Sequence, residues 1–209
     1  HPDTRRNPSA MKTPPGLFRP VGTIWCVGRN YAEHARELGN PVPEAPLIFL
    51  KPASSLLFDG GTLRLPADSK RVEHEVELVL AVGAKRGMAV GVDFTARDIQ
   101  QSAKNKGLPW TMAKARPGFA AVGNFVPLRP GAAFFLSVNG APRQQGDPNA
   151  MLWPVERLLD YLNRHFAVEE GDLLYTGTPA GVGPVAAGDR IEARLGDGES
   201  VLKLTVAAA

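Results

Sequence analysis

Three glutamates alternate within residues 73–80, which read Glu-His-Glu-Val-Glu-Leu-Val-Leu. The alternation is typical of a β-strand, so Glu73, Glu75 and Glu77 are predicted to lie on one face. Like charges on one face repel, and a bound cation would offset the repulsion. Oxygen ligands with no cysteine nearby suit Mg²⁺ or Mn²⁺. A solvated face of an edge strand would also explain the pattern, and this stretch alone leaves both interpretations open.

A second candidate for chemistry is a histidine with a glutamate three residues later. Residues 31–38 are predicted to form a helix, on which His34 and Glu37 are neighbours. A carboxylate in that position can orient an imidazole that takes a proton from water. An exposed helical ion pair is the alternative, and spacing alone favours it.

Groups that could bind an anion follow the glutamates in the chain. Thr95 and Asp98 resemble a capping box that opens a helix over about residues 96–106. Arg97 and Gln100 lie one turn apart near its start, where the helix dipole favours anions. Solvated helix residues are the alternative reading.

Two lysines are weaker candidates for anion binding. Lys51 directly follows a short apolar strand over residues 46–50, and Lys114 ends a segment over residues 110–114 that is predicted to be extended. Solvated lysines often occupy such strand ends, so the signal is weak.

A glycine-rich loop follows a predicted buried strand within residues 171–184. It lacks the Gly-Lys-Ser/Thr ending of a nucleotide-binding P-loop, which excludes that function. The hydroxyls of Thr176 and Thr178 could still line a small site.

The elements that must position these residues are mostly strands. The chain has 209 residues, 22 Gly and 19 Pro, which indicates many turns and a β-rich fold. Residues 134–138 form a predicted strand that ends in Asn139-Gly140, a strong hairpin signal. Residues 151–166 carry the periodicity of an amphipathic helix.

Composition predicts an ordinary globular protein. The net charge is only +3, which gives no support for nucleic-acid binding. Cys26 is the single cysteine, and no apolar run approaches the roughly 20 residues that a membrane helix needs, so a cytoplasmic location is expected. We expect an N-terminal tail over residues 1–21, with residues 1–10 an added extension before Met11, and one catalytic domain over residues 22–209.

Four segments resemble, in order, the motifs of the fumarylacetoacetate hydrolase family. They are Val-Gly-Arg-Asn-Tyr-Ala-Glu-His-Ala-Arg-Glu at residues 27–37, His-Glu-Val-Glu-Leu at 74–78, Asp-Phe-Thr-Ala-Arg-Asp-Ile-Gln at 93–100 and Thr-Gly-Thr-Pro-Ala-Gly-Val-Gly-Pro at 176–184. The resemblance spans about residues 22–207 and is strongest to the small single-domain branch. It implies an α+β, β-rich fold, a mixed-sheet roll of the family's C-terminal-domain type with a few short helices, and a homodimer.

The resemblance also implies roles for individual residues. Its metal site falls on Glu75, Glu77 and Asp93, with Mg²⁺ expected and Mn²⁺ an alternative. The remaining roles fall on two groups: catalytic His34, Glu37 and Lys114, and substrate-binding Arg29, Lys51, Arg97, Gln100 and Thr178. This implication replaces the surface ion pair as the interpretation of His34 and Glu37.

The implied activity is Mg-dependent cleavage of the carbon–carbon bond of a small 3-acylpyruvate, such as fumarylpyruvate or acetylpyruvate, through a stabilised pyruvate enolate. Decarboxylation or keto–enol tautomerisation of oxaloacetate on the same site is the alternative, and a non-catalytic diacid-binding protein is an alternative of another class. Between Arg86 and Gly87 the chain lacks a helical stretch that family members carry, through either a deletion or residues missing from this sequence.

Overall fold

The computed structural model describes residues 13–17, 20–37, 43–83 and 87–209 of the chain. The predicted extension over residues 1–10, the predicted helix end at Leu38 and the junction at Lys85 and Arg86 lie outside these residues. None of the described helices is long and apolar enough to cross a membrane.

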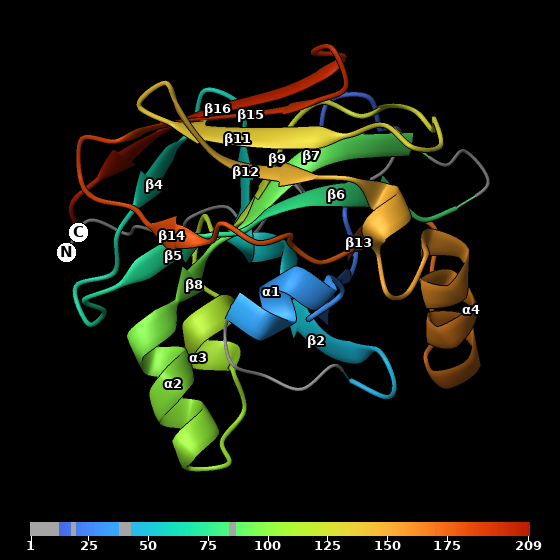
Figure 1. Ribbon diagram of the computed structural model, residues 1–209, viewed down its shortest axis with the longest axis horizontal. Helices are drawn as coiled ribbons and strands as arrows, with labels where there is room; N and C mark the ends of the chain where they lie inside the picture. Colours follow the sequence, from blue (N-terminus) through green and yellow to red (C-terminus); the bar gives the residue numbers. More distant parts are fainter. Residues whose placement is uncertain (1–12, 18–19, 38–42, 84–86) are drawn as a thin grey trace, which may run out of the picture.

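Three β-sheets form the framework of the described molecule, and a five-stranded sheet packs against β6 and β7 of a larger, mixed one (Figure 1). The eight-stranded sheet has the order β2 (Leu47–Lys51), β1 (Ile24–Gly28), β13 (Leu173–Tyr175), β6 (Val76–Ala81), β7 (Gly87–Asp93), β9 (Ala120–Val122) and β3 (Leu56–Phe58), with β10 (Val126–Pro127) paired to β7. The five-stranded sheet has the order β12 (Ala141–Gly146), β11 (Phe134–Val138), β15 (Arg190–Leu195), β16 (Ser200–Ala207) and β4 (Thr62–Arg64). The three-stranded sheet has the order β14 (Gly183–Pro184), β5 (Val72–His74) and β8 (Thr95–Ala96).

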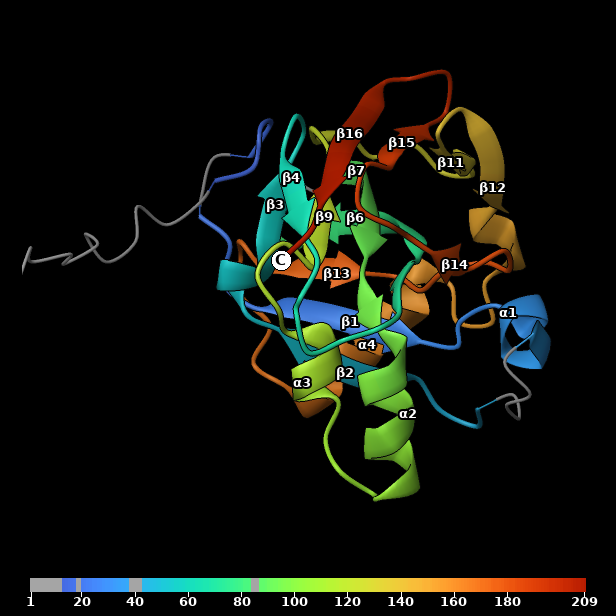
Figure 2. The same cartoon turned by 90° about the vertical axis from the view of Figure 1, so that its left-hand side faces the viewer.

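Four short α-helices lie around the sheets, as the two views show (Figures 1 and 2). They are α1 (Ala32–Glu37), α2 (Arg97–Asn105), α3 (Thr111–Lys114) and α4 (Val155–His165), with single 3₁₀ turns at Ala53–Ser55 and Pro148–Ala150. The α+β, β-rich fold that the sequence predicts is confirmed.

The burial of the strands follows their sequence. The residues of β6 and β7 are all buried, because this sheet is covered on both faces. Strand β15 and the first part of strand β16 instead alternate buried and more exposed residues. One face of their sheet meets the core and the other meets solvent. Central strands therefore hold polar side chains only where those side chains find partners.

The hairpin prediction is confirmed. Strands β11 and β12 pair antiparallel across Asn139 and Gly140, whose φ angles are +53° and +78°. Positive φ at both central residues is what an Asn-Gly turn of this kind requires. The predicted helix over residues 151–166 begins later than expected, at Val155, because Pro154 favours the first turn and Met151 pairs instead with Tyr31 in an isolated bridge.

The prediction of one continuous strand over residues 73–80 is wrong. Strand β5 ends at His74 and β6 begins at Val76, and the two strands belong to different sheets. At the break, Glu75 O accepts a hydrogen bond from Asp93 N at 2.8 Å, while Val76 N donates to the side chain of Gln144 at 3.0 Å. The chain crosses between sheets at Glu75, and its side chain contacts Thr95, Arg97 and Lys114.

Two further local predictions are wrong. The segment over residues 110–114 is not extended, because Trp110 O accepts hydrogen bonds from Ala113 N and Lys114 N and so starts the helix α3. The capping box at α2 is absent, since Thr95 Oγ1 donates to Glu75 Oε1 at 3.1 Å instead of capping the helix. At Thr95 a contact with a buried acid therefore replaces the local preference.

Candidate metal centre and active site

Three buried carboxylates meet where β5 and β7 end and β6 begins. Glu75 lies at the break between sheets, Glu77 on β6 and Asp93 at the end of β7, and each is at most 5% exposed. One carboxylate oxygen from each lies within 4.8 Å of the others, a spacing at which one cation could contact all three. The structure therefore brings together the three residues on which the family resemblance places a metal.

Two buried lysines neutralise part of this charge. Lys114 Nζ donates to Glu75 Oε2 at 2.9 Å and to Asp93 Oδ2 at 2.7 Å. Lys51 Nζ lies 2.5 Å from Asp93 Oδ1 and donates to the carbonyl oxygens of Phe94 and Phe119. Lys51 thus contacts Asp93 from inside the protein, and its ammonium group is within hydrogen-bonding distance of three protein oxygens.

Arg97 extends the network along the start of α2. Its Nε donates to Glu73 Oε2 at 2.5 Å, its Nη2 donates to Glu75 Oε1, and its Nη1 donates to Gln100 Oε1 at 2.6 Å. Glu73, outside the predicted metal set, therefore holds Arg97 in place. Gln100, 3% exposed, uses its carbonyl on Arg97, which leaves its amide hydrogens for another acceptor.

Glu77 is the carboxylate that the protein leaves uncompensated. It accepts a hydrogen bond from Gly177 N at 2.7 Å, and within the described ranges no lysine or arginine pairs with it. Burial, and then repulsion from Asp93 and Glu75, raise its pKa well above the usual value. Burial also raises the pKa of Glu75, but Lys114 and Arg97 outweigh it and the net shift is downward.

The donor set fits a hard divalent cation. A buried carboxylate without a cationic partner is costly. Asp93 Oδ1 lies close to Lys51 Nζ but accepts no well-directed hydrogen bond from the described residues. All the available ligand atoms are oxygens, which Mg²⁺ and Mn²⁺ prefer. Glu75, Glu77 and Asp93 are therefore suited to hold such an ion.

The histidine and glutamate on α1 lie beside the acids. His34 is buried at 4% exposure, and its Nδ1 lies 3.3 Å from Glu37 Oε2. Glu37 is half-exposed and accepts hydrogen bonds from Gly181 N, in the glycine-rich loop. Since the histidine is buried and faces a pocket, this pair differs from a fully exposed helical ion pair.

One small pocket unites these groups. The space inside it is about 30 Å³, enough for an ion or a water. The pocket is lined by residues from seven segments: Val27, Gly28, Arg29, His34, Phe49, Glu75, Glu77, Arg97, Gln100, Lys104, Trp110, Lys114 and Thr178.

Most of the sequence-predicted residues line this pocket, and three do not. Lys51 and Asp93 lie behind its wall, and Glu37 contacts it only through His34. No role was predicted for Phe49, Lys104 or Trp110, which also line it. Phe49 and Trp110 stack edge to face with ring centroids 5.8 Å apart, and nothing in their local sequence distinguishes them from core aromatics.

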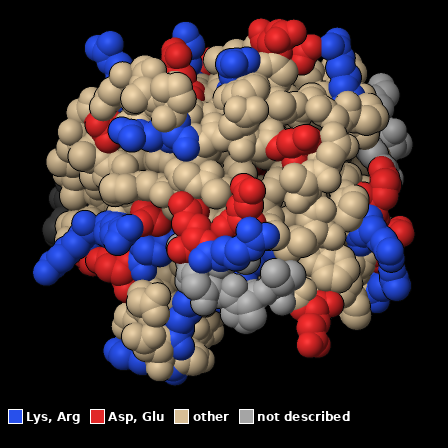
Figure 3. All heavy atoms as spheres, viewed as in Figure 1, with Lys and Arg blue, Asp and Glu red and all other residues tan. Residues whose placement is uncertain are grey.

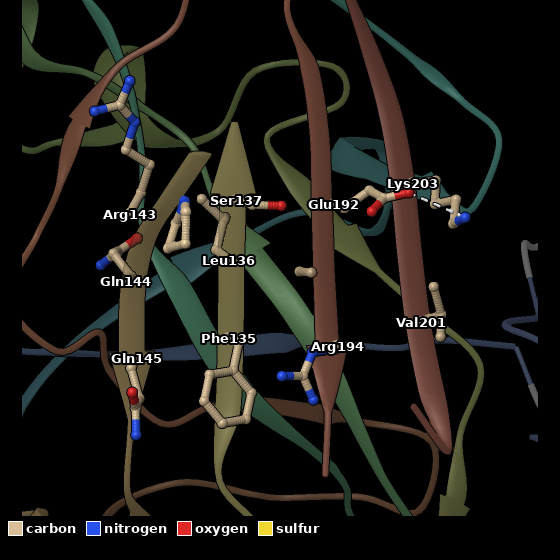
Figure 4. Close-up of a pocket in the computed structure, with 12 residues that line it drawn as sticks. Phe135, Leu136, Ser137, Arg143, Gln144, Gln145, Glu192, Arg194, Val201 and Lys203 are labelled. Carbon is tan, nitrogen blue, oxygen red and sulfur yellow. Dashed lines mark ion pairs between the residues drawn. The ribbon is translucent and has the colours of Figure 1, made fainter. Parts of the chain in front are cut away.

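A much larger groove lies elsewhere in the described structure. It measures about 510 Å³ and crosses the outer face of the five-stranded sheet, between Arg143, Phe135 and Lys203 (Figure 4). The acid cluster contributes nothing to it. Charged side chains of both signs also gather on the surface over α1 and beside α2 (Figure 3).

Comparisons with known proteins point to the family that the motifs resemble. The family model described as fumarylacetoacetate (FAA) hydrolase C-terminal matches residues 23–87 and 86–207, two segments that meet where the sequence lacks the expected helical stretch. The mitochondrial oxaloacetate tautomerase of Arabidopsis thaliana is 43% identical over 195 residues, covering 85% of this chain and 87% of that protein. The mitochondrial oxaloacetate decarboxylase of Dictyostelium discoideum is 40% identical over 188 residues, covering 81% of this chain and 86% of that protein.

A solved structure shows the same fold. The fumarylpyruvate hydrolase of Pseudomonas aeruginosa, determined in complex with Mn²⁺ and pyruvate, superposes with a TM-score of 0.87 at 35% identity and covers 96% of this chain and 99% of that one. The match of motifs, fold and family model along almost the whole chain leads to one conclusion. This protein belongs to the fumarylacetoacetate hydrolase family.

Proposed function

We propose that the protein is a divalent-metal-dependent hydrolase that cleaves the carbon–carbon bond of a small 3-acylpyruvate, such as fumarylpyruvate or acetylpyruvate. One observation carries the proposal. The acid cluster of Glu75, Glu77 and Asp93 adjoins a pocket that also contains the buried His34, backed by Glu37.

Glu75, Glu77 and Asp93 would hold Mg²⁺, with Mn²⁺ as an alternative. A bound divalent cation supplies a Lewis acid for the negative charge that develops on the 2-oxo oxygen when the C3–C4 bond breaks. The solved fumarylpyruvate hydrolase contains Mn²⁺ and pyruvate, which supports this assignment. Lys51 has a positioning role, because its contact holds Asp93 from behind.

The cationic and polar lining of the pocket binds the acid groups of the substrate. Arg97, Arg29 and Lys114 supply positive charge, and Gln100 and Thr178 supply neutral hydrogen-bond donors. Lys114 lies between two carboxylates, so it can donate to a substrate oxygen beside the same acids.

His34 acts as the general base. With Nδ1 directed to Glu37, its Nε2 is left to accept a proton from a water molecule as that water attacks the C4 carbonyl. The C3–C4 electron pair moves onto the pyruvate half, which is protonated at C3 and leaves as pyruvate, while C4 leaves as a carboxylic acid.

A hollow beside the pocket gives room for an acyl group. It measures about 450 Å³, shares Phe49, Trp110 and Lys114 with the pocket, and is otherwise lined mainly by apolar residues such as Leu50 and Leu108. Oxaloacetate does not need this volume, so the hollow favours a larger acylpyruvate.

Decarboxylation or tautomerisation of oxaloacetate is the second candidate function, and the names of two relatives and the small size of the pocket favour it. The two relatives are named as an oxaloacetate tautomerase and an oxaloacetate decarboxylase, and a small diacid fits a small pocket best. Decarboxylation produces the same pyruvate enolate without attack by water, and tautomerisation only moves a proton to and from C3. His34 is expected to matter more for hydrolysis than for tautomerisation.

The test is pyruvate release from oxaloacetate and from a panel of acylpyruvates of increasing acyl length, with Mg²⁺ and then with a chelator. Chelator-sensitive release that is fastest with acylpyruvates supports the hydrolase. Fastest release from oxaloacetate would replace it with the decarboxylase. Accelerated decay of the enol signal without pyruvate would indicate a tautomerase, and ligand-dependent thermal stabilisation with no turnover would indicate a binding protein.

A homodimer is part of the proposal. Strand β2 ends the eight-stranded sheet, and Met112 on α3, which packs against β2, is exposed at 62%. Apolar side chains next to the edge strand of a sheet suit contact with a second chain. Light scattering should give a mass of two chains, and the mass of one chain would contradict this part.

A further inference from the structure

A buried glutamine outside the pocket connects the five-stranded sheet to the site. Gln144 lies on β12, at the margin of the groove on that sheet, and is 4% exposed (Figure 4). Its side chain makes four hydrogen bonds, to Val76 N, His74 Nδ1, Thr178 Oγ1 and Pro179 O. The amide is therefore held at both ends between β5–β6 and the glycine-rich loop.

Two backbone groups fix which way this amide points. Val76 N–H can only donate, so the atom 3.0 Å from it must be the carbonyl oxygen Oε1. Pro179 O can only accept, so the atom 3.0 Å from it must be the amide nitrogen Nε2. Because exchange of the two atoms would break both bonds, the amide has one orientation.

This orientation fixes the polarity of a threonine in the pocket. One hydrogen of Nε2 goes to Pro179 O, and the other goes to Thr178 Oγ1 at 2.8 Å, so Thr178 must accept. Its own hydroxyl hydrogen has no acceptor among the described residues. Thr178 lines the pocket together with His34, Glu77 and Lys114, so this hydrogen is left to be donated to a bound molecule.

The loop that carries Thr178 is itself anchored at the acid cluster. Gly177 N donates to Glu77 Oε2 at 2.7 Å, and Thr176 Oγ1 donates to Leu78 O at 2.8 Å. Gly177 has a φ of +101°, and a Cβ there would lie 2.7 Å from Asn30, so the backbone is confined. Because these contacts fix the backbone, the direction of the Thr178 hydroxyl hydrogen depends on its hydrogen-bond partner, Gln144.

We propose that Gln144 is a positioning residue that, by donating to Thr178, makes the threonine hydroxyl a fixed donor to an anionic oxygen of the substrate, a carboxylate or an enolate. The inference rests on the proposed function, because it needs an oxyanion in the pocket. Under this proposal, a residue of the five-stranded sheet controls a hydrogen bond in the pocket.

Gln144→Glu tests the polarity with almost no change in shape. A carboxyl group lacks the second hydrogen that the amide gives to Thr178, whether it is ionised or protonated with its one hydrogen on Pro179 O. Thr178 must then donate to the introduced carboxyl group and present lone pairs to the substrate. We expect kcat/KM to fall about 10- to 100-fold, the value of a hydrogen bond to a charged group. Gln145→Glu, at the exposed neighbouring position, is the matched control and should leave activity unchanged.

A double-mutant cycle separates this effect from added charge or misfolding. Thr178→Val should lose a similar factor, Thr178→Ser should retain activity, and Gln144→Glu should cost less than about 2-fold in the Thr178→Val background, since the group that it misdirects is gone. Full loss in that background would overturn the proposal, because a charge or packing effect would not depend on the hydroxyl.

Two further measurements keep the inference testable. Gln144→Met removes the donor but cannot accept the hydroxyl hydrogen of Thr178 as a carboxylate would. It should therefore lower kcat/KM less than Gln144→Glu does, and the reverse order would contradict the mechanism. Pyruvate binding by calorimetry with Mg²⁺ present should weaken in parallel with kcat/KM in the Gln144→Glu variant. Absence of both turnover and pyruvate binding in the wild-type protein would refute the proposed function itself, whereas wild-type binding with an additive cycle would refute only the role of Gln144.

Discussion

The pocket at the acid cluster and the groove on the five-stranded sheet handle charge in opposite ways. The pocket offers about 30 Å³ and is bordered by buried carboxylates, lysines and an arginine. The groove offers about 510 Å³, and its charges are exposed, such as Glu192 and Lys203 in an ion pair of 3.0 Å. The larger space is therefore the one whose charges are screened by water.

The difference shows that burial, and not volume, identifies the site. Exposed ion pairs contribute little because water screens them and the side chains lose entropy when they pair. Buried charges are retained only where paired or where they serve a function, and a strongly perturbed carboxyl in a pocket is a candidate functional group. Glu77, whose pKa is raised with no cationic partner among the described residues, marks the pocket as the site.

The largest contrast is expected from the same glutamate change made in both regions. Glu77→Gln should reduce kcat/KM by more than the about 100-fold that loss of a supporting residue costs, and should abolish thermal stabilisation by Mg²⁺. It should also stabilise the metal-free protein, because a neutral amide carries none of the ionisation cost that raises the pKa of the buried Glu77 carboxyl. Glu192→Gln in the groove should leave kcat/KM, the stabilisation by Mg²⁺ and the stability of the metal-free protein unchanged. A Glu77→Gln protein that kept its response to Mg²⁺ would remove Glu77 from the metal site.

A smaller contrast is expected for the two lysines. Lys51→Met leaves Asp93 buried without its closest cation and should lower the free energy of unfolding by about 3–5 kcal/mol. Lys203→Met breaks only the exposed pair with Glu192 and should leave the urea midpoint unchanged. Comparable shifts of the midpoint in the two variants would mean that burial does not separate the regions as argued.

The smallest effect is expected at the edge of the site, at Asp98 on α2. Partial burial raises the pKa of this carboxyl, but hydrogen bonds from Lys70 N, Ser69 Oγ and Ile99 N outweigh it and lower the pKa overall. A lowered pKa in the folded state contributes stability above the ordinary value of about 3.9, and that stability is lost as pH falls through the folded pKa. Asp98→Asn should therefore reduce the urea midpoint at pH 7 and make no difference near pH 2. An equal reduction at both pH values would attribute the effect to packing.

Local sequence determined the parts that depend on neighbouring residues. The Asn139-Gly140 turn follows from the positive φ that both residues tolerate. The pairing of His34 with Glu37 follows from helical spacing. The motif resemblance then brought Asp93 into the predicted metal set, which alternation around Glu75 could not do.

The resemblance did not fix the local geometry. Lys114 was assigned to the site although its segment was predicted to be extended, and helix α3 is what turns it onto Glu75 and Asp93. Lys51 was assigned to the substrate, yet the fold places it behind Asp93. In each case the direction of the side chain depends on partners distant in the sequence.

Residue types and short spacings indicated which side chains were candidates for metal binding and for a base, because those properties belong to single side chains and near neighbours, and the motif resemblance then chose among the candidates. The folded arrangement was needed to show that the chain changes sheets at Glu75, that Glu77 is left without a cationic partner in the described structure, and that Gln144 directs Thr178. These features arise from sheet pairing and from contacts across many residues, such as the one between Gln144 and Val76. Local propensity carries no information about such contacts, since the partner strand is chosen by the packing of the whole core.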